Sequence, residues 1–145
     1  MRNIATGQIR FDHTHVITLF RRYKPDTSPS TKEGLVRNVC AALEIHAQLE
    51  EEIFYPALVE AGIDPEVVAK SVPEHDEMRR LIARLRELEP GDPAYDQMFM
   101  ALMRDVIHHV ADEETTLLYD ADRLLSPERL GEVGRRMTRR RAELV

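Results

Sequence analysis

The sequence of 145 residues contains a single cysteine, Cys40, and no hydrophobic run long enough to cross a membrane. One cysteine excludes a framework of disulfides within the chain and is typical of a reducing compartment. The N-terminus has no apolar segment of the kind that signal peptides carry. We therefore expect a cytoplasmic protein that is not inserted in a membrane.

Strand-like alternation, low-complexity tracts and interdomain linkers are also missing. The length suffices for one domain with a sizeable core, so we expect a single domain over residues 1–145. A net charge of −6 argues against a nucleic-acid partner. A local basic run near the C-terminus is interpreted as a solvated helix face, with a binding patch as the alternative; it comprises Arg135, Arg136, Arg139, Arg140 and Arg141.

Helical periodicity and turn residues divide the chain into four long segments and a short fifth one. The second segment is expected to open with the capping box Ser30-Thr-Lys-Glu33. Because the connections are short, neighbouring helices should be antiparallel, giving an all-α, up-down-up-down four-helix bundle with a short C-terminal fifth helix. The expected segments are Asn3 to Lys24, Ser30 to Ala61, Pro65 to Glu89, Pro93 to Leu125, and the short one from Pro127.

Two histidine–glutamate pairs interrupt this apolar pattern. His46 and Glu50 lie four residues apart, and the same spacing recurs at His109 and Glu113. Residues at this spacing share one helix face, and here that face is the apolar one. A buried ionised carboxylate is costly unless something pairs with it. The pairs therefore indicate a functional site in the core.

Two further histidines, His13 and His75, fall on the other two long segments. Counting residues from each connection, at a rise of roughly 1.5 Å per residue, places them at the height of the two pairs. The candidate site is thus one layer near the middle of the bundle. It comprises His13, His46, Glu50, His75, His109 and Glu113.

The polar neighbours of these residues point elsewhere by helical phase. His15 and His108 are rotated off the apolar stripes. Glu51, Glu52 and Glu114 lie farther from the stripe centres and are interpreted as solvated charge. Tyr55, beside the helix-loosening Pro56, could reach a metal or its surroundings, but a core tyrosine with a satisfied hydroxyl is the preferred interpretation.

Four imidazoles and two carboxylates exceed the needs of a closed tetrahedral zinc site. They suit two divalent ions bridged by the two glutamates, and such mixed ligation is typical of iron used for oxygen chemistry. Other di-metal bundles use a Glu-x-x-His motif on two helices. The nearest matches here end at His15 and His108, off the apolar faces, so we exclude that arrangement.

The pattern His, His-x-x-x-Glu, His, His-x-x-x-Glu resembles the hemerythrin-like, or HHE cation-binding, family over nearly the whole chain. The matching phrases begin at Asp12-His13, Ile45-His46, Glu74-His75 and His108-His109. The resemblance implies a four-helix bundle that holds a non-haem centre of two iron ions and meets O2, peroxide or nitric oxide. It carries the ligand role to the six candidate residues.

One position departs from the oxygen-carrying hemerythrins, which have a second histidine one turn after the ligand of the third helix. Arg79 stands there in this sequence, and Ser71 lies one turn before His75. We therefore expect one iron with an exchangeable position, held by water or by Tyr55, and a redox-active centre that handles peroxide or other reactive species. The alternative is a non-enzymatic oxygen or iron sensor, or a storage module, acting through an unknown protein partner.

Overall fold

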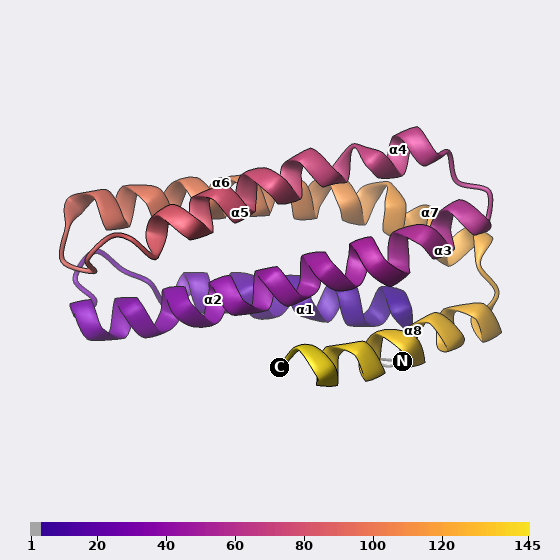
Figure 1. Ribbon diagram of the computed structural model, residues 1–145, viewed down its shortest axis with the longest axis horizontal. Helices are drawn as coiled ribbons and strands as arrows, with labels where there is room; N and C mark the ends of the chain where they lie inside the picture. Colours follow the sequence, from indigo (N-terminus) through magenta and orange to yellow (C-terminus); the bar gives the residue numbers. More distant parts are fainter. Residues whose placement is uncertain (1–3) are drawn as a thin grey trace.

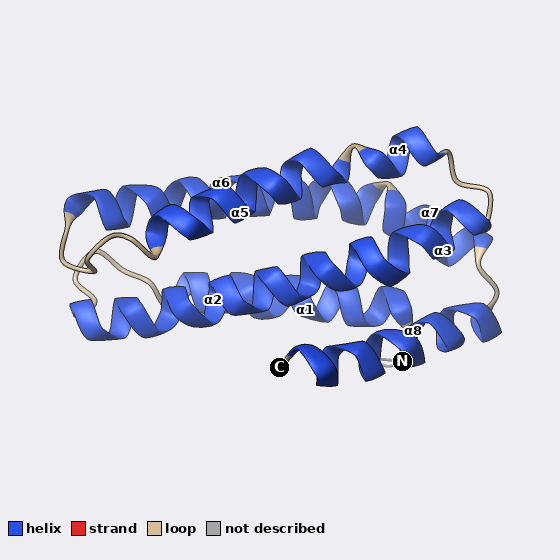
Figure 2. Ribbon diagram, in the orientation of Figure 1, coloured by secondary structure: helices blue, strands red, loops and turns tan. Residues whose placement is uncertain are grey.

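The computed structural model describes residues 4–145, and the regular structure of those residues is entirely helical. Four long antiparallel rods form the expected up-down-up-down bundle (Figures 1 and 2). Asn3, the predicted start of the first helix, lies outside the described residues. The elements are α1 Ala5–Arg21, α2 Pro29–Leu49 continued by the π-helix η1 Glu50–Phe54 and by α3 Tyr55–Glu60, α4 Pro65–Ala69 with α5 Ser71–Leu85, α6 Pro93–Thr115 with α7 Leu117–Leu124, and α8 Pro127–Leu144.

Each rod after the first begins with a capping residue followed by proline, as does α8. A proline at the first helical position loses no hydrogen bond there, while the capping side chain accepts one from a backbone N–H. The capping box predicted at Ser30 is wrong, because Pro29 already occupies the first helical position and Ser28 accepts from the N–H of Thr31 at 3.3 Å. The other caps are Asp64, Asp92 and Ser126.

The fifth helix, α8, is longer than the sequence indicated. It has 18 residues and lies along α1 and α2 on the outside of the bundle (Figure 1). Its buried face includes Leu130, Val133 and Met137, while Arg135 and Arg136 are exposed. Among residues 4–145, no helix has both the length and the apolar character needed to cross a bilayer.

The core consists of two apolar clusters, one towards each end of the bundle. On α1, Ile9 belongs to one cluster and Val16 to the other, with His13 between them. On α2, Leu43 and Leu49 flank His46 in the same way. The polar residues thus form a buried layer between the two clusters.

Candidate metal centre

The structure brings all six candidate residues together in this layer. Their relative exposures range from 0% to 6%, whereas His15 and His108 are exposed, in agreement with the predicted helical phase. Their role as metal ligands stays a prediction. His13 lies on α1, His46 on α2, Glu50 on η1, His75 on α5, and His109 and Glu113 on α6.

The four histidines form two pairs. The ring centroids of His13 and His46 lie 4.9 Å apart, and those of His75 and His109 lie 5.1 Å apart. The Glu50 carboxylate lies 3.3 Å from Nε2 of His46 and 3.2 Å from Nε2 of His75. The Glu113 carboxylate lies 3.2 Å and 3.5 Å from Nε2 of His13 and His109, respectively. Each glutamate therefore spans both histidine pairs.

The atoms that face the middle of the layer make no hydrogen bond within the described residues. They are Nε2 of His13, His46, His75 and His109, Oε2 of Glu50 and Oε1 of Glu113. Buried polar atoms are nearly always satisfied, so six unsatisfied ones in one place indicate the position of a bound ion or of water. Imidazole nitrogens and carboxylate oxygens together are a donor set that suits a divalent transition metal, and the residues therefore fit a metal ion.

These ligand atoms divide into two overlapping groups in which every atom lies within 4.8 Å of the others. One group contains His13, His46, Glu50 and Glu113, and the other contains Glu50, His75 and His109. The groups share Glu50. The second group, which contains His75 of α5, has one ligand atom fewer than the first.

A π-helical turn places Tyr55 in the same layer. Pro56 has no N–H and cannot continue the α-helical bonding. η1 ends two residues before it, with the Tyr55 N–H donating to the Glu50 carbonyl. In a regular α-helix, residues five apart point to different faces. The wider turn brings the Tyr55 hydroxyl to 3.1 Å from Glu50 Oε1 and 2.7 Å from Glu113 Oε2.

The buried Tyr55 hydroxyl keeps its proton. Burial, together with the charges of Glu50 and Glu113, raises its pKa well above the usual tyrosine value. The hydroxyl is therefore a hydrogen-bond donor to the two carboxylates. This agrees with the interpretation of Tyr55 as a core tyrosine with a satisfied hydroxyl.

The outward-facing nitrogen of each of the four layer histidines contacts a carboxylate from a neighbouring rod. Such contacts fix the ring orientation and the tautomer of metal-binding histidines, with Nδ1–H donating to the carboxylate. Around the bundle, one acid per rod supports the histidine of the next rod. The contacts of Nδ1 are His46 with Asp12 at 2.9 Å, His75 with Glu51 at 2.7 Å, His109 with Glu74 at 2.9 Å, and His13 with Glu114 at 2.7 Å.

The interpretation of Glu51 and Glu114 as solvated charge is wrong, because both hold a histidine of the layer. A sequence signal existed: each supporting acid directly adjoins a candidate ligand, as in Asp12-His13. Arg79 does not point to the centre either. Its guanidinium donates to both oxygens of Glu51, at 3.1 and 3.0 Å, and so holds the acid that contacts His75.

Charges within the layer offset the cost of burying it. Although burial disfavours the imidazolium form, Glu50 and Asp12 hold the pKa of His46 well above its ordinary value. Burial likewise lowers the pKa of His109, but the Glu113 and Glu50 carboxylates outweigh it and raise that pKa to about 9. Metal ions bind the neutral imidazole, so a metal at this site competes with these protons.

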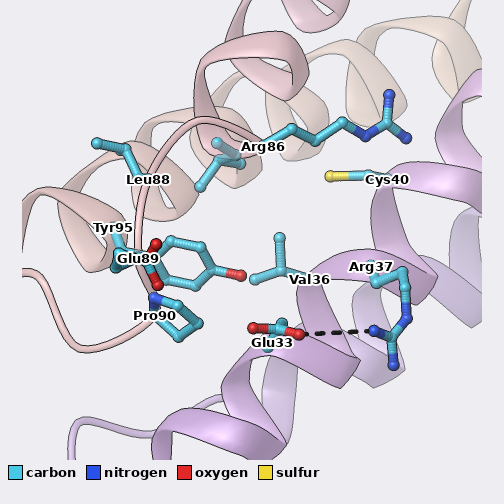
Figure 3. Close-up of a pocket in the computed structure, with 10 residues that line it drawn as sticks. Glu33, Val36, Arg37, Cys40, Arg86, Leu88, Glu89, Pro90 and Tyr95 are labelled. Atoms are coloured by element: carbon cyan, nitrogen blue, oxygen red, sulfur yellow. Dashed lines mark ion pairs between the residues drawn. The ribbon is translucent and has the colours of Figure 1, made fainter.

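A separate pocket of about 370 Å³ lies between α2 and the connection from α5 to α6, with Cys40 and Tyr95 among its lining residues (Figure 3). Cys40 is only 1% exposed, and burial raises the pKa of its thiol from 9.0 to about 11. The thiolate is the reactive form of cysteine. The pocket therefore presents an unreactive thiol.

We expect Cys40 to resist alkylation in the folded protein. A pKa higher by two units leaves about a hundredfold less thiolate at pH 8, and the side chain is covered as well. Iodoacetamide labelling, followed by mass spectrometry, should be at least about a hundredfold slower in buffer than in urea, and faster as the pH approaches 11. Equal rates in buffer and in urea would contradict the buried position.

Comparisons with known proteins agree with this geometry. A DNA nickase from Nostoc sp. (strain PCC 7120 / SAG 25.82 / UTEX 2576) is 29% identical over 120 residues, which are 83% of this chain and 34% of that protein. This chain thus spans about a third of the length of that relative. The fold matches the crystal structure of a hemerythrin HHE cation binding domain-containing protein from Mycobacterium kansasii with a TM-score of 0.81 and 21% identity, covering 97% of this chain and 86% of that one.

The match that extends over most of the bundle is to a family of metal-binding domains. Residues 5–120 match the hemerythrin HHE cation binding domain, and this range includes every residue of the buried layer. The match ends before α8 begins. The chain belongs to the hemerythrin HHE cation-binding family.

Proposed function

We propose that this protein holds two iron ions in the buried layer and uses them in redox reactions with O2, peroxide or nitric oxide. The observation that carries the proposal is the pairing of the histidines with a glutamate spanning both pairs on each side. His13 and His46 would hold one ion, and His75 and His109 the other. Glu50 and Glu113 would bridge them, as carboxylates do in other two-metal sites.

The number of protein ligands supports a reactive centre rather than a saturated one. Iron bound by imidazoles and carboxylates supplies one- and two-electron redox chemistry. With both glutamates as bridges, each ion would be held by two histidines and two shared carboxylates, which leaves positions open at an iron ion. Arg79, which stands where a further histidine could fill one of these positions, is held by Glu51. Open positions of this kind are what metal catalysis uses.

The surroundings of the layer favour a very small substrate. A cavity of about 10 Å³ lies beside His13, His46 and His109, walled on its other sides mainly by apolar side chains such as Val16 and Val106. That space is close to the size of one water molecule. Tyr55 does not line this cavity, and its hydroxyl donates to the Glu50 and Glu113 carboxylates.

The proposal predicts irreversible oxidation in air and consumption of peroxide. The reduced, iron-loaded protein should oxidise quickly, should not return to its starting spectrum when O2 is removed, and in its ferric form should convert two molecules of hydrogen peroxide to two of water and one of O2. The test is to cycle the protein between air and argon while recording its visible spectrum. Oxygen evolved from added peroxide is measured separately, against free iron.

Other outcomes would assign other roles. An oxygenated spectrum that forms and disappears over many cycles, without peroxide consumption above that of free iron, would make the protein a carrier. If neither reversible oxygenation nor peroxide consumption is observed, the result would favour a non-enzymatic sensor or storage module. The nicking activity in the name of the Nostoc relative is not part of the proposal, because this chain spans only 34% of that protein and carries a net charge of −6.

A further inference from the structure

Helix α8 reaches the metal centre although it lies outside the family match. The Arg141 guanidinium donates to Oδ2 of Asp12 at 2.9 Å. The same oxygen lies 2.9 Å from Nδ1 of His46. The Asp12 side chain is 13% exposed, so this contact is largely shielded from solvent. Arg141, Asp12 and His46 thus form a chain of hydrogen bonds from α8 to the buried layer.

We infer that Arg141 is a positioning residue of the metal centre, which acts through Asp12 to raise the reduction potential of the ion held by His46. This rests on the proposed function, in that it requires a redox-active metal. The inference assigns a role to α8 beyond packing against the bundle.

The direction of the change in reduction potential follows from how Asp12 and Arg141 act on the His46 imidazole. A carboxylate that accepts from Nδ1–H increases the basicity of the ring, and a more basic ligand favours the higher oxidation state of its metal. A guanidinium on the same carboxylate oxygen draws negative charge away from the ring and opposes that effect. Loss of Arg141 should therefore lower the reduction potential.

The adjacent arginine provides a matched comparison. Arg140 donates to Glu52 at 3.0 Å and is 33% exposed, close to the 32% of Arg141. Each arginine holds α8 to the bundle through a different carboxylate, Arg140 through Glu52 and Arg141 through Asp12. However, Glu52 contacts none of the layer histidines, whereas Asp12 contacts His46. A purely structural role would make the two arginines equivalent.

A second supporting acid is held by an arginine in the same way. Arg79 holds Glu51, which contacts His75, just as Arg141 holds Asp12. Both arginine-backed histidines flank Glu50. Within residues 4–145, Glu74 and Glu114, which support the two histidines that flank Glu113, pair with no arginine. The arginines are thus confined to the side of the layer that Glu50 occupies.

The test is a spectroelectrochemical titration of the iron-loaded protein and of single variants that are shown to be folded by their melting curves. Arg141→Gln should shift the one-electron equilibrium roughly tenfold towards the oxidised form, which is about 60 mV lower in potential. Arg140→Gln should leave the potential unchanged, and Arg141→Lys should retain most of the original value. Asp12→Asn, which removes the carboxylate charge from His46, should shift the potential in the opposite direction.

The outcomes separate this inference from the proposed function. A wild-type protein with no measurable couple would reject the redox function. A measurable couple that Arg141→Gln leaves unchanged, or that Arg140→Gln shifts equally, would reject the role of Arg141 alone. If Arg141→Gln does not fold, Asp12→Asn decides, because a potential that fails to rise would show that the chain through Asp12 does not act on the metal.

Discussion

Removing the metal by chelation should lower the melting temperature of the protein by up to about 16 °C. The layer places six buried atoms without hydrogen-bond partners where a metal would satisfy them. A ligand that binds only the folded state, present at a thousandfold excess over its dissociation constant, stabilises that state by about 4 kcal/mol. In a chain of this size, each kcal/mol corresponds to about 2–4 °C. Attraction between imidazolium and carboxylate groups in the layer offsets part of the loss, as the raised pKa of His46 indicates.

The measurement is a pair of melting curves followed by circular dichroism at 222 nm, with and without a chelator that is then removed. Adding ferrous iron back under argon is the control, and it should restore the higher melting temperature. Superimposable curves for loaded and chelated protein would show that the layer does not hold a structural metal.

Replacing His109 by alanine should remove at least one metal ion per chain, whereas replacing His108 should remove none. The two residues are adjacent on α6, so the changes in helix propensity and composition are matched. His109 is 4% exposed with an unsatisfied Nε2 in the layer, while His108 is exposed. Loss of a ligand that no neighbour can replace should lower the affinity by several orders of magnitude.

The metal content of the purified variants, measured by plasma emission, decides the matter. His13 and His15 on α1 form a second matched pair, with His13 buried and His15 exposed, and should behave in the same way. Equal metal loss from both members of a pair would mean that the metal is not held in the layer. A melting curve of each variant separates loss of a ligand from loss of the fold.

Periodicity was sufficient to find the four histidines and two glutamates of the layer because a polar residue on an apolar helix face is visible from spacing alone. His46 and Glu50, four residues apart, identify one face without knowledge of any other helix. The bundle topology followed from short connections, and the height of His75 from the constant helical rise. These inferences need only local geometry.

The supporting contacts could not be found in the same way because they depend on which rods are neighbours. Asp12 adjoins His13 in sequence but contacts His46 on another rod, and Glu114 contacts His13 from α6. Arg141 lies 129 positions from its partner. The position of Tyr55 depends on the π-helical turn before it. Pro56 explains why the helix is irregular there, but residue spacing does not specify where the π-helical turn begins and ends.

The handedness of the bundle determines whether each supporting acid comes before or after the neighbouring candidate ligand in the sequence. On the rods that run in one direction, the supporting acid precedes the ligand, as in Asp12-His13 and Glu74-His75; on the rods that run in the other, it follows, as in Glu50-Glu51 and Glu113-Glu114. One step along a helix turns the side chain by about 100°, and reversing the helix reverses that turn when both are viewed from the same end. The alternating order therefore makes all four acids point the same way around the axis. A bundle of the opposite handedness would need the two residues of each of these dipeptides in the reverse order.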